Sequence, residues 1–389
     1  MPTVSAAAMA LVPAPQPAAQ PATALPVLRP LLPRAESYIE ELRAIDERRW
    51  YSNHGPAVRR FEALLAAHFR LPPEGVASFS NGTIALTVAL QALGAQPRQR
   101  CLMPSWTFVA SASAVVGAGL VPHFVDVDPN TWALDPEALA KRHDLAGVGA
   151  VMAVSPFGAP LDRARWETFT AKTGIPVLID AAAGFDAVAS IGRAAPGPTP
   201  MMVSLHATKV FGVGEGAILL SSDRPLVELA RQYGNFGFCS VAEAIVPGTN
   251  AKMSEYAAAV GLATLREWPA RRRQLLTAAT TYRIALSRVP GVSLAPEFGN
   301  GWVGSTCCVT LPGDGLIAGE RLAERGIETR RWWRRGCHHQ PAFAHYTRDK
   351  LPVTLDLARR CLGLPFYPDM TTEDIERVAA ALAACADTD

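Results

Sequence analysis

Residues 204–216 read Ser-Leu-His-Ala-Thr-Lys-Val-Phe-Gly-Val-Gly-Glu-Gly, and this stretch decides the fold. It lies between two short apolar runs, residues 201–204 and 217–220, each of the length of a buried strand. A lysine is normally a solvated surface residue, but one held between two buried strands is partly desolvated, which lowers its pKa. Lys209 can therefore act as a nucleophilic amine that forms a Schiff base. The glycines do not stand between a strand and a helix, so we reject a nicotinamide site here.

Short apolar runs recur before this stretch, and helical patterns separate them. Successive strands with helices between them need crossover connections, which indicate a mostly parallel sheet covered on both faces. We therefore predict an α/β domain around a seven-stranded sheet. The predicted strands are residues 76–79, 101–103, 121–125, 150–154, 177–179, 201–204 and 217–220.

Three regions are predicted along the chain. Residues 1–30 are rich in Ala and Pro, and no charged side chain precedes Arg29, so we expect a disordered tail. Residues 31–252 form the predicted large domain. Residues 253–389 form a small α+β domain, because a long helical stripe is followed there by mixed strand and helix patterns. Its predicted strands lie near 303–311 and 327–330, and its predicted helices near 352–361 and 371–384.

Composition excludes several classes of protein. Lys and Arg number 37 against 35 Asp and Glu, a formal charge of +2, which gives no general attraction for nucleic acid. No run of 18 apolar residues occurs, so a membrane-spanning helix is excluded on length. The seven cysteines are scattered without a C-x-x-C pair, which argues against a zinc site or a disulfide framework. We expect a cytoplasmic protein with reduced thiols, no metal, and no nucleic-acid or membrane partner.

Ligands of open parallel sheets bind beyond the carboxyl ends of the strands, so the residues that follow each strand are informative. Residues 80–83 read Ser-Asn-Gly-Thr at the start of a predicted helix, where free N–H groups and the helix dipole attract phosphate. Alternatively, Asn81 and Thr83 only cap that helix. Trp106 follows another strand and either stacks on a planar ligand or packs in the core.

Asp180 ends a strongly apolar run, where a carboxylate needs a structural partner or a cationic ligand. In chain order, the sequence thus offers a phosphate-ready helix start, an aromatic ring, a buried aspartate and Lys209. These groups meet the needs of pyridoxal 5′-phosphate (PLP), which has a phosphate to anchor, a ring to stack, a pyridine nitrogen to keep protonated and an aldehyde to hold.

From about Trp50 to the C-terminal helix, the chain resembles the DegT/DnrJ/EryC1/StrS family of PLP-dependent sugar aminotransferases, of fold type I. The resemblance rests on a combination of short motifs. They are Gly-Pro at 55–56 with Phe-Glu at 61–62, Asn-Gly-Thr at 81–83, Pro-Ser-Trp-Thr-Phe at 104–108, Phe-Val-Asp-Val-Asp at 124–128, Asp-Ala-Ala at 180–182, Ser-Leu-His-Ala-Thr-Lys at 204–209, Asn-Ala-Lys-Met-Ser-Glu at 250–255, His-His-Gln-Pro at 338–341 and Leu-Pro-Phe-Tyr-Pro at 364–368.

The resemblance implies a role for each matching residue. Lys209 would hold the cofactor and carry a proton between substrate and cofactor, and Asp180 would pair with the pyridinium nitrogen. Trp106 would stack on the ring. The other implied cofactor contacts are Gly82, Thr83, Ser204, His206 and, reaching the phosphate of the neighbouring subunit's cofactor, Asn250. A homodimer with shared active sites is therefore implied.

The sequence departs from the family at Ala183, where Gln or His commonly lies near the ring hydroxyl. Because Lys209 is present, the family's dehydratase branch, which has histidine there, is disfavoured. Arg331 and His338 are the expected substrate-binding residues. Arg331 belongs to the run Arg-Arg-Trp-Trp-Arg-Arg at 330–335, whose arginines suit a diphosphate or a carboxylate; the alternative is a solvated basic loop.

The expected activity is transfer of an amino group from an amino acid, with L-glutamate as the expected donor, to a keto-sugar that we expect to be nucleotide-linked. Such a reaction belongs to amino-sugar or polysaccharide synthesis or to secondary metabolism. Two alternatives stay open. The acceptor could be a non-nucleotide keto substrate such as a keto-sugar acid, held by the arginine run. Or the protein could bind PLP as a sensor or regulator, which Ala183 and the long tail suggest.

Overall fold

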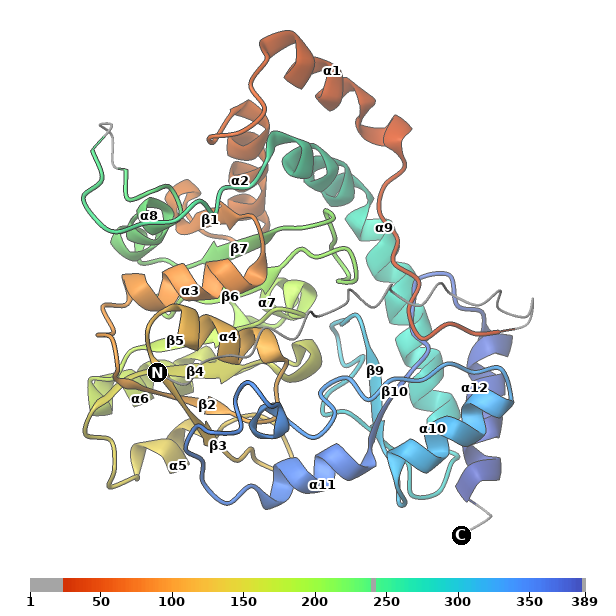
Figure 1. Cartoon of the computed structure of the whole chain (residues 1–389). Coiled ribbons are helices and arrows are strands. Elements are labelled where there is room, and N and C mark those ends of the chain that lie inside the picture. Colours follow the sequence, from red (N-terminus) through yellow and green to blue (C-terminus); the bar gives the residue numbers. More distant parts are fainter. Residues whose placement is uncertain (1–23, 239–242, 387–389) are drawn as a thin grey trace, which may run out of the picture.

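A seven-stranded sheet forms the centre of the large domain (Figure 1). The computed structural model describes residues 24–238 and 243–386 of the 389. The strand order is β1-β7-β6-β5-β4-β2-β3, and within this sheet only β7 runs antiparallel to its neighbours, which confirms the predicted topology. The strands are β1 (Val76–Phe79), β2 (Arg100–Pro104), β3 (Val121–Val125), β4 (Val148–Val154), β5 (Val177–Asp180), β6 (Met201–Ser204) and β7 (Ala217–Leu220).

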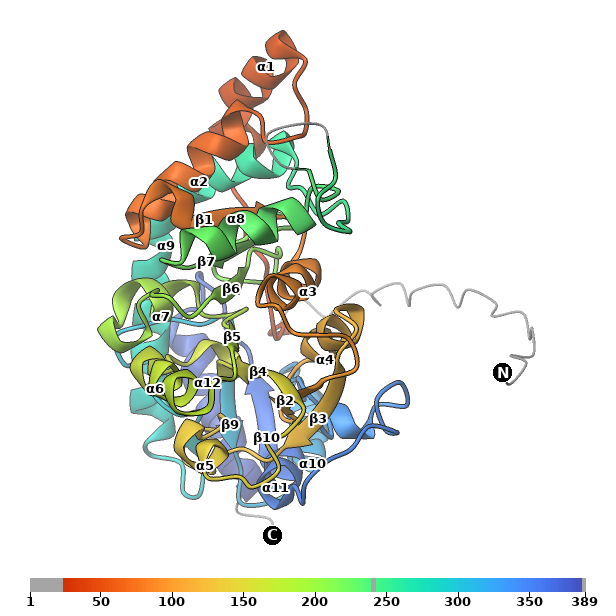
Figure 2. The ribbon, with the colours of Figure 1, turned by 90° about the vertical axis from the view of Figure 1, so that its left-hand side faces the viewer.

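Helices cover both faces of this sheet, with α3 and α4 on one side and α6 and α7 on the other (Figure 2). The side chains of each strand alternate between the two faces. On β6, Met202 packs with the α3 and α4 side, whereas Met201 and Val203 pack into the opposite layer. The helices of this domain are α1 (Ile39–Arg48), α2 (Pro56–His68), α3 (Gly82–Ala92), α4 (Val109–Gly117), α5 (Pro136–Ala140), α6 (Arg163–Thr173), α7 (Phe185–Ser190) and α8 (Arg224–Tyr233), with short 3-10 helices at Ala35–Tyr38, Pro73–Gly75, Pro156–Gly158 and Gly192–Ala194.

The long helix α9 (Glu255–Leu286) packs on α2, in the part called the large domain here, and on α12, in the carboxyl-terminal part called the small domain here. Ser254 caps it by accepting a hydrogen bond from the Ala257 N–H, at 3.1 Å. Although α9 has 32 residues, neither it nor any other helix in the described part of the chain is long and apolar enough to cross a membrane.

The small domain holds a three-stranded sheet in the order β10-β9-β8. The segment near 327–330, predicted as a strand, forms only isolated bridges, from Ile327 to Leu25 and from Arg330 to Gly363. The elements of this domain are β8 (Ser293–Leu294), β9 (Cys307–Thr310), α10 (Gly315–Glu324), a 3-10 helix at Cys337–His339, α11 (Pro352–Arg360), β10 (Cys361–Leu364) and α12 (Thr372–Ala386).

Residues 24–30 form an ordered arm on the small domain, so the predicted tail boundary at residue 30 lies too late. The Leu25 N–H donates to the Gly326 carbonyl and the Glu328 N–H donates to the Leu25 carbonyl, both at 2.9 Å. Leu25 and Val27 are only 7% and 5% exposed, because their alternate apolar side chains cover the small domain. The rest of the predicted tail, residues 1–23, lies outside the described residues.

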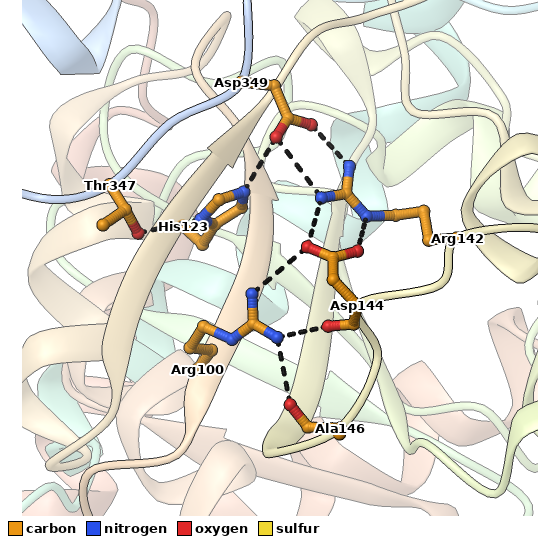
Figure 3. Close-up of polar contacts among 7 residues, drawn as sticks. All are labelled: Arg100, His123, Arg142, Asp144, Ala146, Thr347 and Asp349. Atoms are coloured by element: carbon orange, nitrogen blue, oxygen red, sulfur yellow. Dashed lines mark hydrogen bonds and ion pairs between the residues drawn. The ribbon is translucent and has the colours of Figure 1, made fainter.

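A segment from the carboxyl-terminal part of the chain lies against the edge strand β3, where Arg348 forms an isolated parallel bridge with Phe124; Figure 3 shows the side-chain contacts there. The Phe124 N–H donates to the Thr347 carbonyl at 3.0 Å, and the Asp349 N–H donates to the Phe124 carbonyl at 2.9 Å. The His123 ring bridges the same segment, with Nδ1 2.8 Å from Thr347 Oγ1 and Nε2 3.0 Å from Asp349 Oδ1. The carboxyl-terminal part of the chain is thereby anchored at the edge of the sheet.

Two arginines complete this anchor. Arg142 binds the carboxylates of both Asp349 and Asp144, and its Nε and Nη2 lie 2.8 Å from the Asp144 oxygens. Arg100 donates to the Asp144 carboxylate at 3.4 Å, to the Asp144 carbonyl, and to the carbonyl of Ala146 at 3.0 Å. The group is called the β3 clamp below and comprises Arg100, His123, Arg142, Asp144, Thr347 and Asp349 (Figure 3).

Candidate active site

Asp180 is the last residue of β5, and it is only 5% exposed. Its carboxylate accepts hydrogen bonds from Ser111 Oγ at 2.7 Å and from the Ala182 N–H at 3.1 Å. Burial raises the pKa of Asp180, although these hydrogen bonds and the charge of Lys209 oppose the shift. In the described part of the chain, no lysine or arginine donates a hydrogen bond to this carboxylate. It is therefore suited to a cationic ligand.

Lys209 lies in the loop between β6 and β7, and its N–H donates to the His206 carbonyl at 2.9 Å. The loop is tight because the Ala207 N–H bonds the Gly214 carbonyl at 2.8 Å and Gly214 adopts a φ of 98°, which favours glycine. Burial lowers the pKa of Lys209, as predicted, while the charge of Asp180 opposes the shift. The fold thus brings an easily deprotonated amine within electrostatic reach of a buried carboxylate.

The start of α3 leaves backbone donors free. Asn81 caps the helix by accepting from the Ile84 N–H at 3.0 Å, but no described residue accepts a hydrogen bond from the N–H groups of Gly82 or Thr83. A Cβ on Gly82 would lie 3.3 Å from the sulfur of Met202 and 3.6 Å from Ser204 Cβ, so glycine lets β6 approach. The helix start and Ser204 together can bind a phosphate.

Trp106 follows β2, is only 2% exposed, and packs edge-on against Phe157 and Trp333, with ring centroids 6.3 and 5.2 Å away. Phe157 and Trp333 stack on each other at 4.0 Å. The indole N–H of Trp106 has no acceptor among the described residues. Phe157 was not among the predicted site residues, although it stands just after β4, at the same edge of the sheet as Asp180.

His338 is held by Ser105, whose bond to this histidine was not predicted. The His338 N–H donates to Ser105 Oγ at 3.2 Å, and His338 Nδ1 lies 2.6 Å from the same oxygen. Because Ser105 is fully buried, its hydroxyl hydrogen needs an acceptor, and Nδ1 supplies it. Burial, followed by nearby His339 and Arg348, lowers the pKa of His338 to about 4. The ring is thus neutral at pH 7 and carries its hydrogen on Nε2.

Three predicted site residues form hydrogen bonds with residues of this chain that were not predicted to belong to the site. Arg331 donates to the Ala358 carbonyl on α11, and its Nε is buried without an acceptor among the described residues. Asn250 is exposed, and its side chain accepts from Lys252 Nζ at 2.7 Å. His206 bonds Thr208 Oγ1 through Nδ1 at 2.8 Å.

Ala183 lies against the turn that carries Phe157. A Cβ on Gly158 would come within 2.4 Å of the Ala183 carbonyl, and Gly158 has a φ of 96°, so the two backbones approach closely here. The side chain of Ala183 is small and offers no hydrogen-bonding group at this close approach.

These features fit PLP. Among the described residues, no cation donates a hydrogen bond to the buried Asp180, which therefore suits a protonated pyridine nitrogen. The free N–H groups of Gly82 and Thr83 suit a phosphate, and the amine of Lys209 has a lowered pKa.

Comparison with known proteins agrees with this fit. The model of the DegT/DnrJ/EryC1/StrS aminotransferase family matches residues 34–383. Protein Rv3402c of Mycobacterium tuberculosis is 34% identical, over 92% of this chain and 89% of its own. The dTDP-4-amino-4,6-dideoxy-D-glucose transaminase of Shigella dysenteriae is 32% identical, over 69% of this chain and 72% of its own. The structure of DesI, determined in the presence of its TDP-sugar product, superposes with a TM-score of 0.84 at 31% identity, covering 94% of this chain and 93% of DesI. The chain therefore belongs to the DegT/DnrJ/EryC1/StrS family and is a PLP-dependent aminotransferase.

Proposed function

We propose that the protein transfers an amino group from L-glutamate to a nucleotide-linked keto-sugar, as a cytoplasmic homodimer that serves amino-sugar, polysaccharide or secondary-metabolite synthesis. The observation that carries the proposal is the half-buried Lys209, whose pKa is lowered, near the buried carboxylate of Asp180. The sugar acceptor is supported by the family and by two relatives, the Shigella transaminase that is named for a dTDP-sugar and DesI with its TDP-sugar product.

PLP, when bound, withdraws electrons from the carbon that carries the amino group. Lys209 would take the proton from that carbon and deliver it to the cofactor carbon, and its lowered pKa, which burial causes, favours the neutral amine that this step needs. Asp180 holds the positive charge of the ring nitrogen. The N–H groups of Gly82 and Thr83 and the hydroxyl of Ser204 bind the phosphate.

The sugar side of the site is assigned to His338 and Arg331. His338 offers a neutral Nε2–H as donor to a sugar oxygen, because Ser105 occupies Nδ1. Trp106 offers an aromatic ring to the cofactor. In Arg331, the unpartnered Nε marks a donor that an anionic part of the substrate can use.

The homodimer is proposed from the exposure of Asn250. Its side chain bonds only the nearby Lys252 among the described residues, while the neighbouring Ala251 carbonyl accepts from the Ser80 N–H at 2.7 Å, beside the start of α3. Asn250 is thus positioned at the surface near a phosphate site and can reach the site of a second copy. Size measurement on the purified protein tests the dimer, and a monomeric active enzyme would contradict it.

A half-reaction assay tests the function. The PLP form is mixed with L-glutamate, and we expect loss of its yellow absorbance as the pyridoxamine form accumulates. That form is then offered a panel of nucleotide-linked keto-sugars and free keto-sugar acids. Return of the yellow form with a nucleotide-linked sugar is expected. Return only with a free sugar acid would contradict the proposed acceptor, and failure with every amino donor would favour a sensor over an enzyme of this kind.

A further inference from the structure

A buried arginine lines the same small cavity as Lys209. Arg271, on α9, is only 5% exposed. Its Nη2 donates to Glu267 at 3.2 Å, but its Nη1 is buried and has no acceptor among the described residues. Burial lowers the pKa of this guanidinium, and the charge and hydrogen bond of Glu267 oppose the shift. A buried donor on a charged group is costly unless something accepts its hydrogen bond, so this nitrogen marks a place for an anion.

Arg271 lines a small cavity between the two domains. Thr208 and Lys209 come from the loop between β6 and β7, Ser305 and Tyr367 come from the small domain, and the N-terminal arm contributes residues 28–31. The cavity is small, with a volume of about 30 Å³.

The other two described cationic side chains that line this cavity, Arg29 and Lys209, already have partners or roles. Arg29, in the arm, forms an ion pair with Asp369 at 2.6 Å and lies over the Tyr367 ring at 4.7 Å. Lys209 is required for chemistry. Among the described lining residues, Arg271 is therefore the one with a spare charged donor, and Ser305 adds a hydroxyl group to the same lining.

We infer that Arg271 binds a carboxylate of the amino-acid donor. The inference rests on the proposed function, since it assumes an amino acid that reacts at Lys209. An amino donor must bring an amine to Lys209, and it carries a carboxylate close to that amine. The planar fork of a guanidinium matches a carboxylate, and the charge-assisted bond gains strength in a buried place.

Binding of glutarate to the holoenzyme tests this site without turnover, because glutarate has both carboxylates of glutamate and no amine. Arg271→Met keeps the side-chain volume and removes the charge. We expect its dissociation constant for glutarate, measured by calorimetry, to rise about 10- to 100-fold. Arg273→Met is the matched control, because Arg273 is an exposed arginine on the same helix, and we expect a change below about twofold. Unchanged glutarate binding in Arg271→Met, or no binding to the unmodified enzyme, would overturn the inference.

Donor kinetics show which carboxylate is bound. In Arg271→Met we expect the KM for L-glutamate to rise while the reaction of the pyridoxamine form with a keto-sugar keeps its rate. An equal loss with L-glutamine assigns the α-carboxylate, whereas a loss with L-glutamate alone assigns the γ-carboxylate. An equal loss in both half-reactions would overturn the inference. If the unmodified enzyme converts no keto-sugar at all, the proposed acceptor fails while the glutarate result still decides the role of Arg271.

Discussion

The Lys209 site and the β3 clamp both hold acidic and basic side chains at one sheet. The carboxylates of the clamp are hydrogen-bonded to basic side chains, whereas no basic side chain in the described part of the chain is hydrogen-bonded to the carboxylate of the site. In the clamp, burial alone would raise the pKa of Asp349, but hydrogen bonds from Arg142 and His123 outweigh burial and lower it. Hydrogen bonding to Arg142 likewise lowers the pKa of Asp144. At the site, burial dominates and raises the pKa of Asp180. Charges that hold the fold together are matched within the chain, whereas charges that await a ligand are left short of partners.

Replacing Lys209 should have the largest effect, because it should abolish most of the turnover without lowering the stability of the fold. Lys209→Met removes the amine that moves the proton, so we expect turnover to fall by about 1,000-fold or more. The melting temperature of the cofactor-free protein should stay equal or rise, because a poorly solvated ammonium is removed. Lys172→Met is the control, since Lys172 is exposed on α6, and it should change neither quantity. Full activity in Lys209→Met would refute the assignment.

Asp180→Asn should be the next largest change in activity, with a fall in the glutamate half-reaction of about 100-fold or more, because the charge opposite the ring nitrogen is lost. The stability of the cofactor-free protein should instead increase at high pH. The folded pKa of Asp180 is raised, so its stabilising contribution is complete below the unfolded pKa of about 4 and is lost as pH rises through the folded pKa. Asn does not ionise. The difference in melting temperature between the cofactor-free variant and the cofactor-free unmodified protein should therefore be more favourable to the variant at pH 8 than at pH 4. Equal pH dependence in both proteins would contradict the raised pKa.

Asp349→Asn tests the clamp and should cost stability rather than chemistry. The substitution removes the negative charge of the carboxylate to which both Arg142 and His123 are hydrogen-bonded. We therefore expect a loss of about 1–2 kcal/mol in the free energy of unfolding. The glutamate half-reaction should keep its rate. Asp356→Asn is the control, because Asp356 forms exposed pairs on α11, and it should cost less than about 0.5 kcal/mol. Denaturant unfolding compares the two, and equal losses would show that the clamp is no stronger than a surface pair.

Ala183→Gln should have the smallest effect. It adds an amide where the family commonly has one, and a single neutral hydrogen bond is worth about 0.5–1.5 kcal/mol. We expect a change of less than about tenfold in either half-reaction, together with a shift in the absorption maximum of the bound cofactor. Ala138→Gln, at an exposed position of α5, should leave the spectrum unchanged. A spectrum of Ala183→Gln identical to that of the unmodified enzyme would mean that the side chain does not reach the ring.

The sheet was predictable because buried parallel strands are short apolar runs. The observed bounds of β1, β3, β6 and β7 agree with the predicted ranges residue for residue. β10 was missed, since the four residues Cys361–Leu364 follow a helix directly and become a strand only by pairing with β9. Long, regular apolar patterns are local signals, whereas edge pairings depend on distant parts of the chain.

At the site, the residues that end strands could be predicted, but those that support them could not. Asp180 and Lys209 stand at visible junctions of strand and loop. Ser111, which bonds Asp180, and Ser105, which orients His338, act across separations of 69 and 233 residues. A serine within a helix or after a strand carries no local pattern that reveals such a partner.

The N-terminal arm can fold only late during synthesis of the chain, because its partners are made last. The Val27 N–H bonds Glu328, 301 residues later, at 3.2 Å. At about 5–20 residues per second, a ribosome needs about 15–60 s to make the intervening chain. During that time Leu25 and Val27 have no surface to cover, so the first part of the arm to leave the ribosome is among the last to dock. A nascent chain halted before residue 326 should therefore lose its N-terminal segment to a protease, while the finished protein should keep residues 25–27 protected.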